Sequence, residues 1–163
     1  MQNSFPDITY PSSDGVFNLR AGAIILKNEK VLMVTNARDP YYYSVGGRVK
    51  LHETLEDAII REVFEETGVV FEIERLVWIH ENFFTITGGA NDGKRYHELS
   101  FFYLMKPKSD AIITSGSYTN DGAKERLEWL SLDRLNDYEL YPKMFKTELR
   151  NLPKTPTSVV TIE

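Results

Sequence analysis

The sequence predicts one α/β or α+β domain, in which a mixed β-sheet carries helices packed on it. Three observations lead to this class: β-prone segments precede and follow one strongly amphipathic helical segment, no linker divides the chain, and 163 residues suit a single compact domain. We therefore treat residues 1–163 as one domain with an irregular lead-in over residues 1–15, which are rich in Pro, Ser and Asp.

Aliphatic and aromatic runs before the helical segment predict strands separated by turns. The last run stops at Gly46-Gly47, a pair that permits backbone angles other residues resist. In order, we expect a strand over Val16–Leu26, a turn over residues 27–30, a returning strand over Val31–Val34 and a short strand over Tyr41–Val45.

The helix is predicted over Thr54–Thr67, where apolar residues recur at helical spacing and mark a buried face. These residues are Leu55, Ala58, Ile59 and Val63. Gly68 stands where a left-handed C-cap glycine is expected, so the helix ends there.

The part of the chain after the helix predicts a hairpin and then two short helices. A Gly-rich turn over residues 87–94 separates two β-prone runs, which is typical of a hairpin. We expect one long or two short strands over Val69–Ile86, a strand over Arg95–Leu104, a strand over Glu128–Leu130, a helix over Leu132–Leu135, and a last helix that Pro142 opens and Leu149 ends.

Composition excludes several classes of function. The chain has no cysteine, so disulfides, zinc thiolate sites and cysteine nucleophiles are ruled out, and this fits a reducing cytoplasm. The N-terminus lacks the pattern of a signal peptide, and no apolar run is long enough to span a membrane. The net charge of −5 argues against binding to nucleic acid, but an acidic chain still binds a polyphosphate through a divalent cation.

Three carboxylates share one face of the predicted helix. Glu62, Glu65 and Glu66 stand at i, i+3 and i+4, a spacing at which like charges oppose the helix by about 0.2–0.5 kcal/mol per pair. Two of them lie in the last turn, where the helix dipole favours cations. A divalent cation is one compensator, and an all-oxygen site suits Mg²⁺ or Mn²⁺. The alternative is a solvated acidic face whose charge is balanced by Arg61.

A wider pattern surrounds these acids. The residues at the defining positions are Gly47, Glu53, Arg61, Glu62, Val63, Glu65, Glu66, Gly68 and Val69, and they fit G-x5-E-x7-R-E-U-x-E-E-x-G-U, where U is a bulky aliphatic residue. A chance match has odds on the order of 10⁻⁸ to 10⁻⁷. Over residues 47–69 the chain resembles the Nudix family, and the resemblance implies an α/β/α sandwich with a mixed sheet.

The resemblance also implies the role of each box residue. Glu62, Glu65 and Glu66 would bind Mg²⁺ or Mn²⁺ together with the backbone carbonyl of Gly47, and one of the box glutamates, Glu62 or Glu65, is a candidate general base. Glu53 and Arg61 would lock the box loop to the helix through charge-assisted hydrogen bonds. The implied reaction is attack of water on phosphorus, which cuts a pyrophosphate bond.

Residues outside the box are weaker candidates. Glu98 is a candidate for an additional ligand or base, and the alternative is an acid that points to solvent, because strand register decides its side. His97 would face the opposite side and is given no role. Arg20 and Arg48 are candidates for phosphate contacts because guanidinium matches phosphate in a bidentate manner, and surface ion pairs are the alternative.

Aromatic residues near the box admit two interpretations. Stacking on a nucleobase is one, and burial in the core is the more frequent use of strand aromatics. The residues concerned are Tyr41, Tyr42, Tyr43, Phe83 and Phe84. The Tyr41–Tyr43 run would also suit the interface of a homodimer, an assembly that many members of the family form.

The sequence favours an active Mg²⁺-dependent hydrolase that cleaves a nucleoside diphosphate linked to another group, with a small nucleotide-like molecule as its partner. The leading alternative is a silent Nudix domain that binds a nucleotide as a sensor, but such domains usually lose box acids. An isomerase on this scaffold would need further residues, often a cysteine. The secondary signatures of the ADP-ribose, dinucleoside polyphosphate and coenzyme A subclasses are absent, so the substrate stays open.

Overall fold

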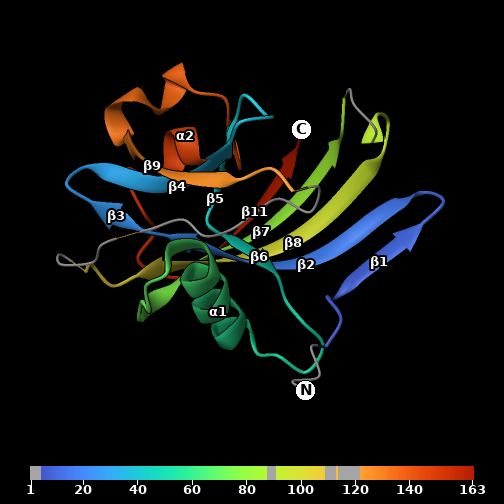
Figure 1. Ribbon diagram of the computed structural model, residues 1–163, viewed down its shortest axis with the longest axis horizontal. Coiled ribbons are helices and arrows are strands. Elements are labelled where there is room, and N and C mark those ends of the chain that lie inside the picture. The colour runs from blue at the N-terminus through green and yellow to red at the C-terminus, as the bar shows by residue number, and fades with distance from the viewer. Residues whose placement is uncertain (1–4, 88–90, 109–112, 114–121) are drawn as a thin grey trace.

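The computed structural model describes residues 5–87, 91–108, 113 and 122–163, and within these ranges the strands form two sheets (Figure 1). The larger sheet has the order β1 (Thr9–Ser12), β2 (Gly15–Ile24), β8 (Arg95–Met105), β7 (Ile73–Thr85) and β11 (Thr157–Ile162), with β6 (Gly46–Arg48) also paired to β2. The smaller sheet has the order β10 (Leu140–Tyr141), β5 (Tyr42–Ser44), β4 (Lys30–Asn36) and β3 (Leu26–Lys27), with β9 (Glu125–Ser131) paired to β4.

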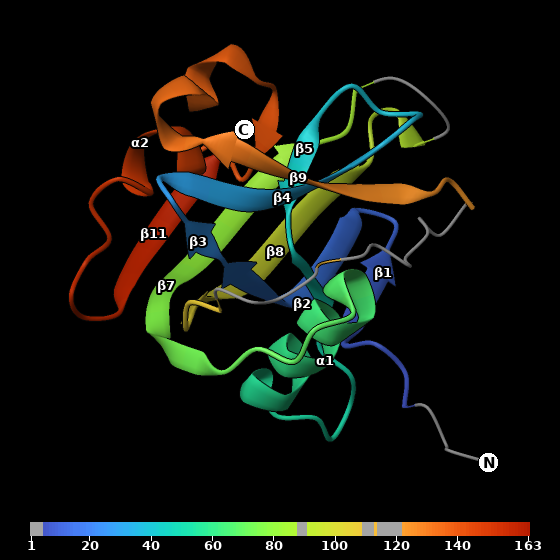
Figure 2. The ribbon, with the colours of Figure 1, turned by 60° about the vertical axis from the view of Figure 1, so that its left-hand side comes forward.

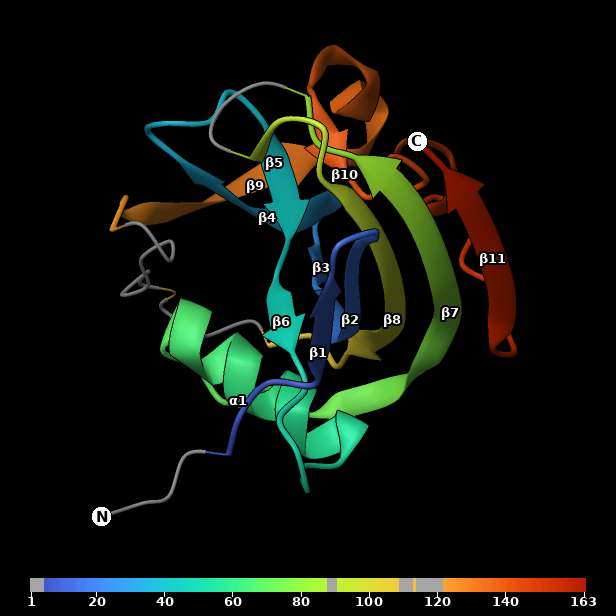
Figure 3. The same ribbon diagram turned by 90° about the vertical axis from the view of Figure 1, so that its right-hand side faces the viewer.

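Helices cover the sheets on two sides, which is the arrangement of an α/β/α sandwich. Figures 2 and 3 show α1 (Leu55–Thr67) below the sheets and the segment with η2 (Leu132–Asp137) and α2 (Phe145–Glu148) above them. The predicted fold class is therefore confirmed. The strands form two sheets instead of the one mixed sheet expected. In the larger sheet β2 pairs in parallel with β8, and β7 and β8 form the predicted antiparallel hairpin.

Two apolar clusters fill the layers between the sheets and the helices. On one side, Ala58, Ile59 and Val63 of α1 pack against alternate residues of β2 and β8, such as Ala21 and Tyr103. On the other side, the intervening residues of the same strands pack with the η2–α2 segment, and this cluster includes Ile24, Trp78, Phe102 and Phe145. The alternation of strand side chains thus separates an α1 side from an α2 side of the larger sheet.

Most predicted elements exist, and their ends differ. The strand expected over Val16–Leu26 breaks between Ile24 and Leu26, where the chain passes from the larger sheet to the smaller one. Val69–Ile86 contains one long strand, and the strand expected over Glu128–Leu130 runs from Glu125 to Ser131. The turn expected over residues 87–94 lies partly outside the described residues.

Two predictions were wrong, one helix is of another type than expected, and one strand was missed. The lead-in over residues 1–15 contains β1, because Thr9–Ser12 pairs with the start of β2. Pro142 does not open a helix, since α2 begins only at Phe145, and the expected helix at Leu132–Leu135 is the 3₁₀ helix η2. The strand β11, which pairs in parallel with β7, was not predicted at all. Among the residues that the structure describes, no helix has the length and hydropathy needed to cross a membrane.

Candidate active site

Capping at both ends fixes the length of α1 and thereby the position of its acids. Thr54 is the N-cap, and its side-chain oxygen accepts a hydrogen bond from the Asp57 backbone N–H at 3.1 Å. Gly68 is the C-cap in the left-handed conformation, with φ 72°, and its N–H bonds the Phe64 carbonyl. Gly68 lies where the sequence predicts the C-cap, and Thr54, at the predicted start of the helix, is the N-cap.

Arg61 joins α1 to the loop before it. Its Nε and Nη2 donate to the two carboxylate oxygens of Glu53 at 2.7 and 2.9 Å, and Nη2 also donates to the Arg48 carbonyl at 3.1 Å. The Lys50 backbone N–H donates to the same carboxylate at 2.9 Å. Hydrogen bonds from Arg61 hold the pKa of Glu53 below its usual value, against the effect of burial. This geometry is the loop-to-helix lock expected of Glu53 and Arg61.

We expect this lock to contribute to stability. Arg61→Ala removes a bidentate pair whose side chains are 20% and 14% exposed and leaves Glu53 without its main partner, so the free energy of unfolding falls by about 2 kcal/mol. Urea denaturation measures the change. Arg134→Ala is the matched control, because its pair with Asp137 is 67% and 55% exposed, and we expect an unchanged midpoint. Equal midpoints for both variants would contradict the prediction.

The third nitrogen of Arg61 contacts two of the box acids. Nη1 lies 2.6 Å from Glu62 Oε1 and 3.3 Å from Glu65 Oε2. Burial raises the pKa of Glu62, and the Arg61 hydrogen bond opposes that rise. Glu65 is the most accessible of the box acids in this contact, with a side chain 52% exposed.

Glu66 is buried, although a glutamate in water is charged at neutral pH. It is 7% exposed, and its Oε2 accepts a hydrogen bond from the Gly46 backbone N–H at 3.1 Å. Burial raises its pKa well above the usual value, and the nearby carboxylates of Glu125 and Glu62 add to the rise. A buried anion surrounded by other anions requires a compensating positive charge.

The residues here fit a hard divalent cation. All side-chain donors are carboxylate oxygens, which Mg²⁺ and Mn²⁺ prefer. A Cβ at position 47 would overlap both oxygens of Glu62, so only glycine lets this carboxylate approach the backbone there. In the ranges that the structure describes, no three acidic or imidazole side chains already stand in a metal-binding group, and Arg61 donates to Glu62 and Glu65.

The candidates outside the box occupy neighbouring strands. Glu98 Oε1 accepts a hydrogen bond from Asn18 Nδ2 at 2.9 Å and lies 3.8 Å from Arg20 Nη1, so Glu98 and Arg20 are brought together. The charge of Arg20 weakly opposes the rise that burial causes in the pKa values of Glu62 and Glu66. His97 lies on the opposite face of β8 from Glu98, as expected from strand alternation.

Arg48 stands directly opposite Arg20 in the pairing of β2 with β6. Its Nη1 lies 3.5 Å from Asp7 Oδ2, and its buried Nε has no hydrogen-bond partner within the structure. An unpaired buried guanidinium N–H is costly, and an anionic group would satisfy it. Two cationic side chains therefore stand at facing positions beside the box loop.

Sequence reasoning missed a second acidic group near Glu66. Glu125, 8% exposed at the start of β9, accepts a hydrogen bond from the Tyr43 hydroxyl, and its charge raises the pKa of Glu66. Burial is the largest cause that raises the pKa of Tyr43, followed by this hydrogen bond. Because Tyr43 and Glu125 are 82 positions apart, only the pairing of β4 with β5 and β9 brings them together. The sequence offered no signal for Glu125, because it stands outside the strand predicted over Glu128–Leu130 and joins β9 only in the structure.

The Tyr run does not form an open aromatic wall. The hydroxyl of Tyr42 donates to Glu128 at 2.8 Å, and burial followed by this hydrogen bond raises the pKa of Tyr42 to about 12. Tyr41 stands edge-on to Tyr141. The side chains of Tyr41, Tyr42 and Tyr43 are half-buried. Tyr42 packs against the apolar cluster on the α2 side, which favours the core interpretation for this residue.

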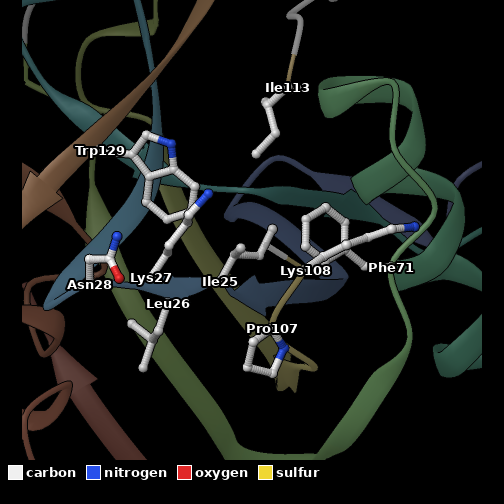
Figure 4. A pocket seen from close by; sticks show the side chains of 9 residues that line it. All are labelled: Ile25, Leu26, Lys27, Asn28, Phe71, Pro107, Lys108, Ile113 and Trp129. Atoms are coloured by element: carbon white, nitrogen blue, oxygen red, sulfur yellow. The ribbon is translucent and has the colours of Figure 1, made fainter. Parts of the chain in front are cut away.

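A hollow of about 410 Å³ lies away from the box acids (Figure 4). Trp129, Phe71 and Ile25 line it together with Lys27. None of the box acids lines this hollow, so volume alone does not indicate the reactive site.

The comparisons with known proteins agree with the geometry of the box. The family model of the NUDIX domain matches residues 16–150. The chain belongs to the Nudix family. Two curated relatives are an ADP-ribose pyrophosphatase of Methanocaldococcus jannaschii, 27% identical over 69% of this chain, and a MutT-like protein of Streptomyces ambofaciens, 32% identical over 72% of it. The chain spans 60% and 65% of their lengths.

Solved Nudix structures share the fold. A MutT NUDIX hydrolase from Burkholderia pseudomallei matches with a TM-score of 0.54 and 25% identity, covering 72% of this chain and 84% of that one. A MutT protein from Methanosarcina mazei Go1 matches with a TM-score of 0.61 and 19% identity, covering 83% and 91%. The sandwich around α1 is thus the Nudix fold.

Proposed function

We propose that this Nudix domain, over residues 1–163, is an active Mg²⁺-dependent pyrophosphohydrolase, with Mn²⁺ as a possible substitute. Its substrate is a small molecule in which a nucleoside diphosphate is linked to another group. The observation that carries the proposal is the complete box with Glu66 buried beside Glu62 and Glu125, since a buried cluster of carboxylates is stabilised by a divalent cation. The names of the relatives, among them a pyrophosphatase, support the same reaction class.

Each box residue has a role in this proposal. Glu62, Glu65, Glu66 and the Gly47 carbonyl would hold the cation, which would supply positive charge against the pyrophosphate oxygens and activate water for attack. Glu53 acts through Arg61, which fixes the loop that carries Gly47. Because Arg61 contacts Glu62 and Glu65, it also orients the two acids among which we place the general base.

Arg20, Arg48 and Glu98 form the other side of the proposed site. Arg20 and Arg48 face each other across β2 and β6, and guanidinium groups bind phosphate oxygens in a bidentate manner. We assign them to the diphosphate. Glu98 is held by Asn18 and Arg20, so it remains the proposed acid from outside the box, either as a ligand or as a base.

The setting of the reaction follows from composition. The lack of cysteine fits a reducing compartment, and we place the protein in the cytoplasm. The net charge of −5 argues against nucleic acid as a substrate, so a small nucleotide-like molecule is preferred.

The test is a hydrolysis assay with Mg²⁺ on a panel of nucleotide sugars, dinucleotides, dinucleoside polyphosphates and deoxynucleoside triphosphates. Released phosphate and mononucleotide are measured before and after EDTA treatment. We expect turnover of at least one compound, lost with EDTA and restored by Mg²⁺. Nucleotide binding that requires Mg²⁺ without any turnover would favour the sensor alternative and overturn the proposed activity.

A further inference from the structure

The side chains of β7 and β8 on the α2 side of the larger sheet change in character toward the hairpin end. The pairing of these two strands is regular outward from Trp78 opposite Phe102, so alternate residues stay on the side of that buried pair. Counted outward, the facing pairs on this side are His80 and Ser100, then Asn82 and Glu98, then Phe84 and Tyr96. Two polar pairs and one aromatic pair thus follow the apolar core along one surface.

The proposed site adjoins these pairs. Arg20, which we assign to the diphosphate, stands opposite Ser100 in the pairing of β2 with β8. Its Nη1 lies 3.8 Å from Glu98 Oε1, so the phosphate side of the site reaches the second polar pair. Successive pairs on one side of a strand are about 6.6 Å apart. From Arg20 outward, the surface therefore offers a cationic, then a polar, then an aromatic place, which is the order of phosphate, sugar and base in a nucleotide.

Asn82 presents a hydrogen-bond donor on this surface. It is 8% exposed, and its Oδ1 accepts a hydrogen bond from the Thr161 hydroxyl at 2.6 Å. That hydroxyl has only one proton to give, so it accepts from His80 Nε2, which lies 2.7 Å away. These bonds fix which end of the Asn82 amide faces Thr161. In the part of the chain that the structure describes, Asn82 Nδ2 has no hydrogen-bond partner, and such a donor calls for an acceptor.

Phe84 offers one ring face to a ligand. Tyr96 stacks on the other face from the β8 side, with ring centroids 5.1 Å apart and planes 6° from parallel. On the β11 side, the strand ends at Ile162, one position short of Phe84. Glu163 follows, and its carboxylate accepts a hydrogen bond from the Lys143 N–H at 3.4 Å. Bases stack on flat aromatic rings, and Tyr96 already orders this one.

The contacts of Phe84 do not match those of a core residue. Phe84 and Tyr96 are half-buried, and among the described residues neither of the two apolar clusters includes them. Tyr42, in contrast, packs against the cluster on the α2 side. Of the two interpretations of the aromatic residues, stacking on a ligand therefore suits Phe84 better than burial in the core.

We propose that the nucleoside part of the substrate binds along β7 and β8 on the α2 side, with its ribose at Asn82 and its base on Phe84. The proposal rests on the hydrolase function proposed above, because the diphosphate at Arg20 sets the direction of the nucleotide. Asn82 Nδ2 donates to a ribose hydroxyl. Thr161 is a positioning residue, since it holds the Asn82 amide in the required orientation.

Calorimetric titration of the full chain in Mg²⁺ tests the place of the base. We expect one of the common ribonucleoside 5′-monophosphates to bind at least about tenfold more tightly than ribose 5-phosphate. Phe84→Leu removes the flat ring and abolishes this difference. Phe83→Leu is the matched control, because Phe83 is also half-buried but stacks on His97 on the opposite side of the sheet, and it leaves the difference unchanged. Equal effects of the two variants, or monophosphates that bind no more tightly than ribose 5-phosphate, would overturn the proposal.

The place of the ribose is tested with the 2′-deoxy and 3′-deoxy forms of the tightest monophosphate. We expect at least one of them to bind the unmodified chain about tenfold more weakly. Thr161→Val keeps the shape of the side chain but frees the Asn82 amide, so this discrimination falls at least about threefold. Thr157→Val, at an exposed position of the same strand, leaves it unchanged. Circular dichroism verifies folding, and equal affinity of the unmodified chain for all three forms would contradict the assignment, as would full discrimination by Thr161→Val.

These titrations separate the binding mode from the activity, because a monophosphate has no anhydride bond to cut. The expected base and ribose effects without hydrolysis of any compound in the panel would overturn the proposed activity and keep the binding mode. Hydrolysis without these effects would keep the activity and overturn the binding mode.

Discussion

Glu66→Gln is expected to abolish most of the hydrolysis while leaving the protein folded. Glutamine keeps the shape of the side chain and its hydrogen bond from the Gly46 N–H but removes the charge that we propose holds the cation. We expect kcat to fall about 10³-fold, because the proposed cation would stabilise the transition state. Steady-state kinetics on the compound that the substrate panel identifies measures the loss.

The stability of Glu66→Gln should change in the opposite direction to its activity. Burial raises the pKa of Glu66 above its unfolded value, so the folded chain binds more protons than the unfolded chain in that pH range. Stability therefore falls as the pH rises through the raised pKa, and the ionised carboxylate is unfavourable at neutral pH without metal. In EDTA, Glu66→Gln is expected to have a urea midpoint equal to or higher than that of the unmodified chain.

Glu56→Gln is the matched control for this variant. Glu56 is an exposed residue in the first turn of the same helix and stands at a variable position of the box. We expect its kcat to equal that of the unmodified chain. A Glu66→Gln variant that retained more than about a tenth of the activity would remove Glu66 from the metal site.

Gly47→Ala is expected to have the second largest effect. The new Cβ would overlap the Glu62 carboxylate, which must then move away from the box loop. We expect kcat/KM to fall about 10²-fold, because Glu62, the proposed ligand, is displaced by roughly an ångström. Overpacking also lowers the free energy of unfolding by about 1–3 kcal/mol. Kinetics and urea denaturation measure the two effects separately.

Gly93→Ala separates lost stability from lost activity. Gly93 has φ +77°, so alanine is strained there, yet no atom lies within 4 Å of the added Cβ. This control carries a cost in stability with no contact to Glu62, and we expect unchanged kcat/KM. If Gly47→Ala and Gly93→Ala reduced activity equally, the close approach of Glu62 to Gly47 would have no functional importance.

The sequence predicts best where the signal is local. The helix over Thr54–Thr67 was predicted with its C-cap Gly68, because apolar spacing and a C-cap glycine act within a few residues. The family resemblance implied that Glu53 and Arg61 join the loop to the helix, and the structure has Arg61 donating to both carboxylate oxygens of Glu53. The metal roles of the box acids remain predictions, since no cation is part of the structure.

What the sequence does not predict depends on pairing between distant segments. Strand β11 was missed because Thr157–Ile162 has no partner nearby in the chain, and it is aligned by β7 some eighty positions earlier. Glu125 was missed for the same reason, since its role beside Glu66 appears only when β9 pairs with β4. The helix predicted to begin at Pro142 was wrong because a proline is permitted in the first turn of a helix but does not start one.

The parallel pairings of the larger sheet also bear on how fast the chain folds. Asn18 bonds Glu98 across 80 positions, and His80 bonds Thr161 across 81. Closing such long loops costs entropy before any contact rewards it, so these steps are slow compared with formation of the β7–β8 hairpin. The hairpin is therefore the natural nucleus, and the β1–β2 pair and β11 join it later, one from each end of the chain. Until they do, both edges of the growing sheet are open to pairing with other molecules, and newly made protein is most prone to aggregate during that interval.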